Sequence, residues 1–155
     1  MNETHLTARG NAVVAEELAW RTEGARARGE PWVFSVPTLD EFDAIRSASS
    51  HRRYPHGTEF RPRWAKSRYA VSGYLFEPTL RYPIDELPPG VFGLSGGVSE
   101  WTTTFFDEAY RLRWTIGGSW TNSDPQQFAV DYKKFIHEDT ATAAWGFRLV
   151  ARRVQ

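Results

Sequence analysis

The spacing of apolar positions predicts a first helix near the start of the chain. Across residues 11–28, Val14, Leu18 and Ala25 recur close to one helical face, with alanines between them as good helix formers. Gly29 ends this pattern, as glycine commonly does just after a helix. We therefore expect a helix over residues 11–28.

A second helix is predicted by a capping box. Thr38 is followed three residues later by Glu41, so the hydroxyl and the carboxylate can each accept a hydrogen bond from a free backbone N–H of the first turn. The apolar stripe that follows comprises Leu39, Phe42 and Ile45. We expect this helix to end within residues 47–50.

Short apolar or alternating runs predict the strands. Residues 32–36 are apolar, residues 112–116 alternate as a half-buried strand would, and residues 145–149 alternate again as a last strand. Residues 51–89 show little periodicity but many aromatic side chains, which indicates long ordered loops with a short strand at 69–76. Gly117-Gly118 allows a bulge or a close backbone approach.

Composition restricts the class of protein. The 155 residues fit one domain, which we place at residues 11–155 after a disordered lead at residues 1–10. Lys plus Arg equals Asp plus Glu, at 19 each, so no overall charge favours nucleic acid, and no apolar run is long enough for a membrane span. Local arginine clusters, including Arg52-Arg53, are interpreted as solvated surface. The absence of cysteine and of an apolar leader leads us to expect a cytoplasmic location.

No arrangement of chemically reactive residues predicts an active site. The four histidines, at positions 5, 51, 56 and 137, show no metal-ligand spacing. Ser119 has no base at a recognisable spacing, and the adjacent carboxylates Asp107 and Glu108 point in different directions, which makes them poor acid–base partners. We expect no catalytic residue and no bound metal.

Four segments in order resemble sulfatase-modifying-factor, or formylglycine-generating-enzyme-like, domains. Residues 36–42 (VPTLDEF) resemble the R-L-P-T-E-A-E-W helix start of that family, and residues 52–57 (RRYPHG) resemble its R-x-Y-P-W-G loop. Residues 90–102 resemble G-L-Y-D-M-x-G-N-V-W-E-W-T, and residues 117–120 with 146–149 resemble the closing R-G-G-S-W and G-F-R-L. The resemblance implies an α+β, C-type-lectin-like fold with two helices, few strands and long ordered loops.

The departures from that family concern its chemistry. Catalytic members carry two cysteines after the G-G-S segment that bind copper and activate oxygen, whereas this chain has Asn122 and Gln127 near those positions, and neither can form a thiolate. A calcium-binding Asn of the family is Gly97 here, and Glu100 alone is a poor ligand set for calcium. The resemblance therefore predicts a protein of the family without cofactor and without formylglycine-generating activity.

The segment between Trp101 and Trp145 is the predicted binding surface. Aromatic side chains give rigid contact area and amides give directional hydrogen bonds, a combination suited to recognition. The candidate binding residues are Trp101, Trp120, Asn122, Gln126, Gln127, Tyr132 and Trp145. Large aromatic side chains more often belong to the core, so the three tryptophans are weaker candidates than Asn122, Gln126 and Gln127. Compared with the family the chain starts late, so an incomplete sheet could pair with another chain, and we expect a protein partner or a homodimer.

These observations favour a non-catalytic binding or sensory domain. Residues 83–90 (PIDELPPG) resemble a segment of modules associated with bacterial Ser/Thr kinases, which suggests a signalling role. One alternative is a variable protein of a diversity-generating retroelement that binds a target through residues 119–145. Another is an accessory subunit, or an oxygen-dependent enzyme that takes its cofactor from elsewhere.

Overall fold

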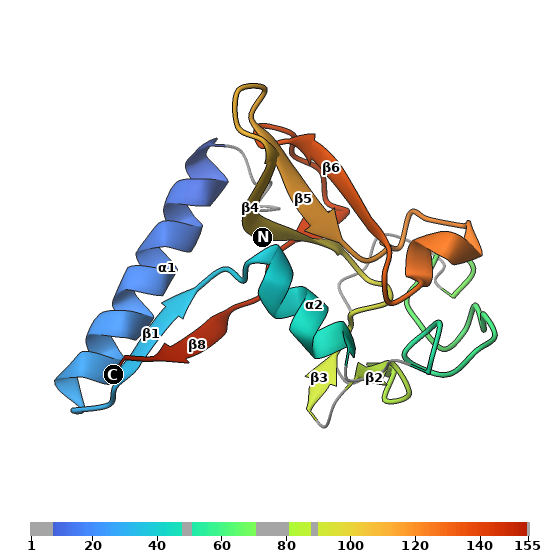
Figure 1. Ribbon diagram of the computed structural model, residues 1–155, viewed down its shortest axis with the longest axis horizontal. Coiled ribbons are helices and arrows are strands. Elements are labelled where there is room, and N and C mark those ends of the chain that lie inside the picture. Colours follow the sequence, from blue (N-terminus) through green and yellow to red (C-terminus); the bar gives the residue numbers. More distant parts are fainter. Residues whose placement is uncertain (1–7, 48–50, 71–80, 88–89, 155) are drawn as a thin grey trace.

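The computed structural model describes residues 8–47, 51–70, 81–87 and 90–154. It has the two predicted helices, α1 (Ala8–Ala27) and α2 (Leu39–Ser47), and a set of short strands separated by long loops. Helix α1 lies beside a ribbon of two strands, while α2 lies between that ribbon and the remaining sheets (Figure 1). The fold is α+β, as the sequence predicted.

The first and last strands, β1 and β8, pair with one another. Strand β1 (Trp32–Ser35) runs antiparallel to β8 (Val150–Arg153), with Val33 opposite Arg152. Helix α1 packs on this ribbon, and the Thr22 hydroxyl accepts a hydrogen bond from the Phe34 N–H at 3.1 Å. The first predicted helix and the strand at residues 32–36 are therefore confirmed to within a few residues, and α1 begins at Ala8 rather than at position 11.

Helix α2 begins as its capping box requires. The Thr38 N–H donates to Oε2 of Glu41 at 2.7 Å, and the Glu41 N–H donates to Oγ1 of Thr38 at 3.2 Å. Arg152 of β8 donates from Nε to the same Glu41 carboxylate at 2.6 Å, which fastens the helix start to the terminal ribbon. The paired guanidinium lowers the pKa of Glu41 to about 2.

The principal sheet has the order β6-β5-β4-β7. Its strands are β4 (Ser99–Asp107), β5 (Leu112–Ile116), β6 (Lys133–His137) and β7 (Trp145–Gly146), and β7 is parallel to β4 whereas the other pairs are antiparallel. A smaller hairpin pairs β2 (Glu86–Leu87) with β3 (Val91–Phe92). The predicted strand at 112–116 is confirmed, but Thr115 is fully buried, so the expected exposed face is partly covered.

The predicted last strand at residues 145–149 is wrong. Trp145 and Gly146 pair with β4, residues 147–149 leave that sheet, and the chain then enters β8, which pairs with β1. The alternation of residues 145–149 correctly indicates that successive side chains face opposite surroundings. It does not indicate which strand pairs with this segment. Arg148, in the middle of the connection, turns inward to Glu100.

Two apolar clusters form the core. Phe42, Leu87, Leu94 and Ile116 are buried between α2, the β2–β3 hairpin and β5. A second cluster of Tyr54, Phe128 and Ala129 anchors the long loop after α2 against the 3₁₀ helix η2 (Pro125–Phe128). Aromatic side chains thus order residues 51–70, as expected. The strand predicted at 69–76 lies almost wholly outside the described residues, and Tyr69 and Ala70 are in a turn.

Candidate functional site

The loop after β5 is positioned by close backbone contacts at two glycines. Gly117 has φ 71°, and an added Cβ there would lie 2.7 Å from the Leu94 carbonyl oxygen. At Gly118 an added Cβ would lie 2.6 Å from the Gln127 carbonyl oxygen. Only glycine fits both positions, which explains the close approach predicted for Gly117-Gly118.

Ser119 and Asn122 lock the turn that follows. Oδ1 of Asn122 accepts hydrogen bonds from the Ser119 N–H at 2.6 Å and from Oγ of Ser119 at 2.9 Å. The Asn122 N–H donates back to the Ser119 carbonyl at 2.9 Å. Ser119 is 1% exposed, so its hydroxyl serves this turn and is withdrawn from any substrate.

Trp120 leaves this turn and forms one wall of a groove. Its N–H donates to the Gly97 carbonyl at 2.7 Å, and its indole Nε1–H donates to the Ala143 carbonyl at 3.3 Å. These bonds hold the loop after β5 against both the glycine-rich segment and residues 142–145. The ring is consequently fixed in place while part of its surface stays exposed.

Trp145 forms the opposite part of the same groove, which has a volume of about 570 Å³. The Trp145 ring packs edge-on against Trp101 at a centroid distance of 5.7 Å. Trp101 is 8% exposed, and its buried Nε1–H has no hydrogen-bond partner among the described residues. The indole groove, as we call it, is lined by Ser119, Trp120, Thr121, Lys134, Thr142, Ala143, Ala144 and Trp145.

Lys134 is the one charged side chain among those lining residues. Its Nζ lies 5.4 Å from the centroid of the Trp145 ring, within the range of a cation–π contact. Burial lowers the pKa of Lys134 below its usual value, because the partly buried ammonium loses hydration. The indole groove is therefore mostly apolar, with two aromatic walls and a single amine.

The predicted binding residues do not form one site. Trp120 and Trp145 line the indole groove, with Trp101 packed against Trp145, whereas Gln126 and Tyr132 line a second groove that shares no lining residue with the first. Asn122 holds the turn at Ser119, and Nε2 of Gln127 donates to the Tyr132 hydroxyl at 3.3 Å. Whether any of them contacts a ligand stays a prediction, but their positions separate them into two surfaces and a structural turn.

A buried charged cluster lies beneath the glycine-rich segment. Glu100 accepts two hydrogen bonds from Arg148, so both of its oxygens are occupied. Burial raises the pKa of Glu100, opposed by the Arg148 charge. Asp85, which is 2% exposed, accepts hydrogen bonds from the Ser95 and Gly96 N–H groups, and burial raises its pKa to about 8. With one cation for two carboxylic groups, the cluster keeps a proton near neutral pH.

The described residues contain no group of three or more His, Cys, Asp or Glu side chains that could hold a metal ion. His56 stacks on Tyr54, and its Nε2 accepts a hydrogen bond from the Arg61 N–H at 3.4 Å. Burial lowers the pKa of His56. Within the same ranges, no helix has both the length and the apolar character needed to cross a membrane.

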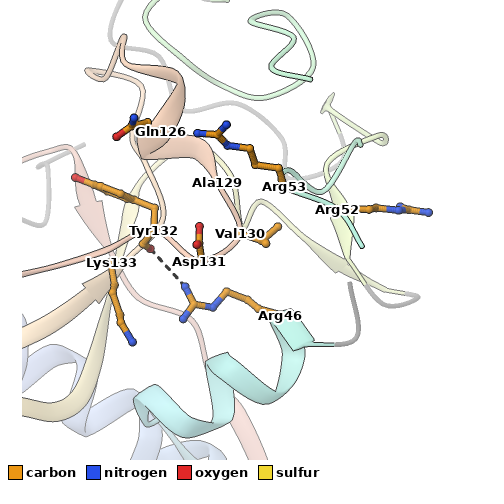
Figure 2. Close-up of a pocket in the computed structure, with 9 residues that line it drawn as sticks. All are labelled: Arg46, Arg52, Arg53, Gln126, Ala129, Val130, Asp131, Tyr132 and Lys133. Atoms are coloured by element: carbon orange, nitrogen blue, oxygen red, sulfur yellow. Dashed lines mark hydrogen bonds between the residues drawn. The ribbon is translucent and has the colours of Figure 1, made fainter. Parts of the chain in front are cut away.

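Sequence reasoning missed the second groove. It is lined by Arg46, Arg52, Arg53, Gln126, Ala129, Val130, Asp131, Tyr132 and Lys133 (Figure 2). Arg52-Arg53 was interpreted as solvated surface, and nothing in the spacing indicated that residues 46 and 126–133 lie beside it. Arg46 in the last turn of the second helix, followed by Arg52-Arg53 in the loop after it, was the only signal available.

Comparisons with known proteins agree with this architecture. Residues 14–153 match the family described as the sulfatase-modifying factor enzyme 1-like domain. The solved structure of PvdO from Pseudomonas aeruginosa is similar at a TM-score of 0.67 and 18% identity, over 91% of this chain and 59% of that one. The crystal structure of CarF is similar at a TM-score of 0.55 and 22% identity, over 79% of this chain and 48% of that one. A comparison with functionally curated proteins gives no match.

Proposed function

Because the chain belongs to the sulfatase-modifying factor enzyme 1-like family, with its C-type-lectin-like α+β fold, we propose that it is a non-catalytic binding domain of that family. Its ligand is a protein segment that places an apolar or aromatic side chain in the indole groove. The chain spans about half the length of the two structural relatives described above.

The observation that carries the non-catalytic part is the role of Asn122. It stands near a position where catalytic members of the family have a thiol, and its Oδ1 accepts two hydrogen bonds from Ser119. An amide oxygen committed to the backbone of its own turn has neither the charge nor the freedom of a metal-binding thiolate. With no cysteine anywhere in the sequence, the family's oxidation has no nucleophile here.

The binding part of the proposal is supported by the walls of the indole groove. Trp120 is held at its indole N–H and its backbone N–H, and Trp145 is held against Trp101, so little side-chain entropy remains to be lost on binding. Rigid tryptophans are frequent in the energetically dominant parts of protein interfaces. Lys134 at the base gives a donor for a carbonyl or carboxylate of the bound segment.

The first test uses defined probes and the unmodified chain. Titration with N-acetyl-tryptophanamide or N-acetyl-leucinamide, followed by ¹H–¹⁵N NMR, should shift the indole signals of Trp120 and Trp145. N-acetyl-aspartamide is the polar control. Shifts confined to signals outside the indole groove would refute the binding part.

The non-catalytic part has a separate test. Elemental analysis of the purified protein and oxygen-consumption measurements should find neither stoichiometric iron or copper nor oxygen uptake. A stoichiometric transition metal would instead favour the oxygen-dependent alternative. The kinase-associated signalling role and the retroelement alternative stay predictions. A kinase gene beside this gene would favour the signalling role. A neighbouring reverse transcriptase gene with a near-copy of the coding region for residues 119–147 would favour the retroelement alternative.

A further inference from the structure

The second groove, which is lined in part by Gln126 of η2, has a different character from the indole groove. It has a volume of about 760 Å³ and brings together the end of α2, the loop after it, residues 126–132 and the start of β6. Its lining contains four basic side chains, Arg46, Arg52, Arg53 and Lys133, against one carboxylate, Asp131; Asp43, outside the lining, pairs with Arg46 and Lys133. The whole chain has a formal net charge of zero, so this is a local concentration of positive charge.

Arg46 is the buried element of this groove. Its side chain is 7% exposed, its Nη2 pairs with the half-exposed Asp43, and its Nη1 donates weakly to the Tyr132 carbonyl at 3.4 Å. Its Nε–H is buried and has no hydrogen-bond partner among the described residues. A buried guanidinium with an unused donor is costly unless an anion supplies the missing interaction.

The groove is held open by main-chain contacts. The Val130 N–H donates to the Arg53 carbonyl at 2.8 Å, and the Tyr132 carbonyl accepts from the Gly117 N–H at 3.2 Å. Figure 2 shows Arg46 reaching toward Tyr132 from one side and Arg53 reaching toward Gln126 from the other, with Asp131 between them. Arg52 points away in this view and donates to the Pro55 carbonyl at 3.1 Å.

We infer that this groove binds a small ligand through a phosphate group, with Arg46 and Arg53 as the main contacts. Two guanidiniums approaching from opposite sides suit the several acceptor oxygens of a phosphate dianion, and the Gln126 amide adds a neutral donor at the same place. Lys133 adds positive charge at long range, although its Nζ lies 3.8 Å from Asp43 and faces Trp114. The Asp131 carboxylate opposes the anion and limits its affinity.

The experiment titrates the protein with phenyl phosphate and with inorganic phosphate at low ionic strength, using calorimetry and ³¹P NMR. Saturable binding of both is expected, weakened by added salt because partly exposed charges are screened. Arg53→Gln should weaken binding about 5- to 10-fold, whereas Arg63→Gln, on an exposed arginine outside the groove, should leave it unchanged. Asp131→Asn should strengthen binding about 3- to 10-fold.

Each other outcome overturns the inference. The inference is overturned if no saturable binding is seen up to about 10 mM phosphate, since this result excludes even a millimolar affinity. Weaker phosphate binding by Asp131→Asn would show that the Asp131 carboxylate does not repel the bound phosphate, so the anion would not lie between Arg46 and Arg53 beside it. Equal losses in the Arg53 and Arg63 variants would indicate diffuse charge attraction, and tight binding of a single-stranded oligonucleotide without binding of phenyl phosphate would assign the surface to nucleic acid. The Ala143→Phe variant, which fills the indole groove, should not alter phosphate binding, so the two proposals fail independently.

Discussion

A buried ion pair between Arg148 and Glu100 joins two segments that resemble motifs of the family. Arg148 donates from Nε to Oε2 of Glu100 at 2.6 Å and from Nη2 to Oε1 at 2.8 Å, and Nη2 also donates to the Phe92 carbonyl at 3.0 Å. Arg148 of the Gly-Phe-Arg-Leu segment thus neutralises Glu100 of the Glu-Trp segment. Both residues are explained by this structural role.

Replacing Arg148 by Met should strongly destabilise the fold. The change leaves the Glu100 carboxylate buried without its cation, and removing one partner of a buried pair costs about 3–5 kcal/mol. Urea unfolding at pH 7 measures the loss. Arg111→Met is the control, since the exposed Arg111 pairs with Glu138 and Asp139 near the surface and their loss should cost about 1 kcal/mol. Similar losses in the two variants would contradict the importance of the buried pair.

Asp85→Asn should stabilise the protein increasingly as the pH rises. The pKa of Asp85 is about 8 in the fold and near 3.8 when unfolded, so the unfolded chain gains stability by ionising while the folded protein stays protonated. The contribution of Asp85 is fully present below pH 3.8 and is lost as the pH rises toward 8. The variant lacks this loss.

The measurement compares unfolding free energies of the two proteins at pH 5, 6 and 7. The difference should grow by about 1 kcal/mol per pH unit. Asp40→Asn, on an exposed carboxylate, is the control for a general charge effect. A difference between wild type and Asp85→Asn that is constant with pH would show that Asp85 is ionised in the fold.

Unlike the contribution of Asp85, the contribution of Glu41 to stability should be lost as the pH falls. Arg152 lowers its pKa to about 2, so its contribution is present above about pH 4.5 and is lost as the pH falls toward 2. Glu41→Gln keeps the capping box and removes the charge, so it should cost about 1–2 kcal/mol at pH 7, discounted for the partial exposure of both side chains. The cost should shrink at pH 3. An equal cost at both pH values would contradict the charge pairing.

Local patterns predicted the parts of the fold that depend on neighbouring residues. The Thr38–Glu41 capping box, the strand at residues 112–116 and the close approach at Gly117-Gly118 all appeared as expected. Each depends on hydrogen bonds or steric limits within a few residues, or on a missing side chain. Such features are visible in a short window of sequence.

Features that depend on distant partners were not predictable in the same way. The alternation at Trp145 to Leu149 concealed a change of strand partner from β4 to β1. The candidate binding residues were treated as one surface, but Gln126 and Tyr132 line a different groove from Trp120 and Trp145. Which groove a side chain lines is decided by tertiary packing, and so is the assembly of Arg46 with Arg53.

Gly96→Ala should be much more destabilising than an ordinary glycine substitution. An added Cβ at Gly96 would lie 2.4 Å from the Lys66 carbonyl oxygen, which itself accepts the Gly97 N–H at 2.9 Å. The resulting shift of the loop should cost about 2–3 kcal/mol by thermal or urea unfolding. Gly24→Ala, inside α1 and near only a flexible Arg28 side chain, should instead stabilise by about 0.5–1 kcal/mol. Equal effects would contradict the close packing of the two loops.

The central claim is that Trp120 and Trp145 form the binding surface, and a matched pair of variants tests it most directly. Ala143→Phe fills the indole groove, whereas Ala141→Phe adds the same side chain two residues away, outside its lining. Both are titrated with N-acetyl-tryptophanamide, with the NMR shifts of the two indole signals as the readout. If Trp120 and Trp145 form the binding surface, Ala143→Phe should weaken binding at least about tenfold, while Ala141→Phe should bind as the wild type does. Unchanged binding by a folded Ala143→Phe variant would contradict it.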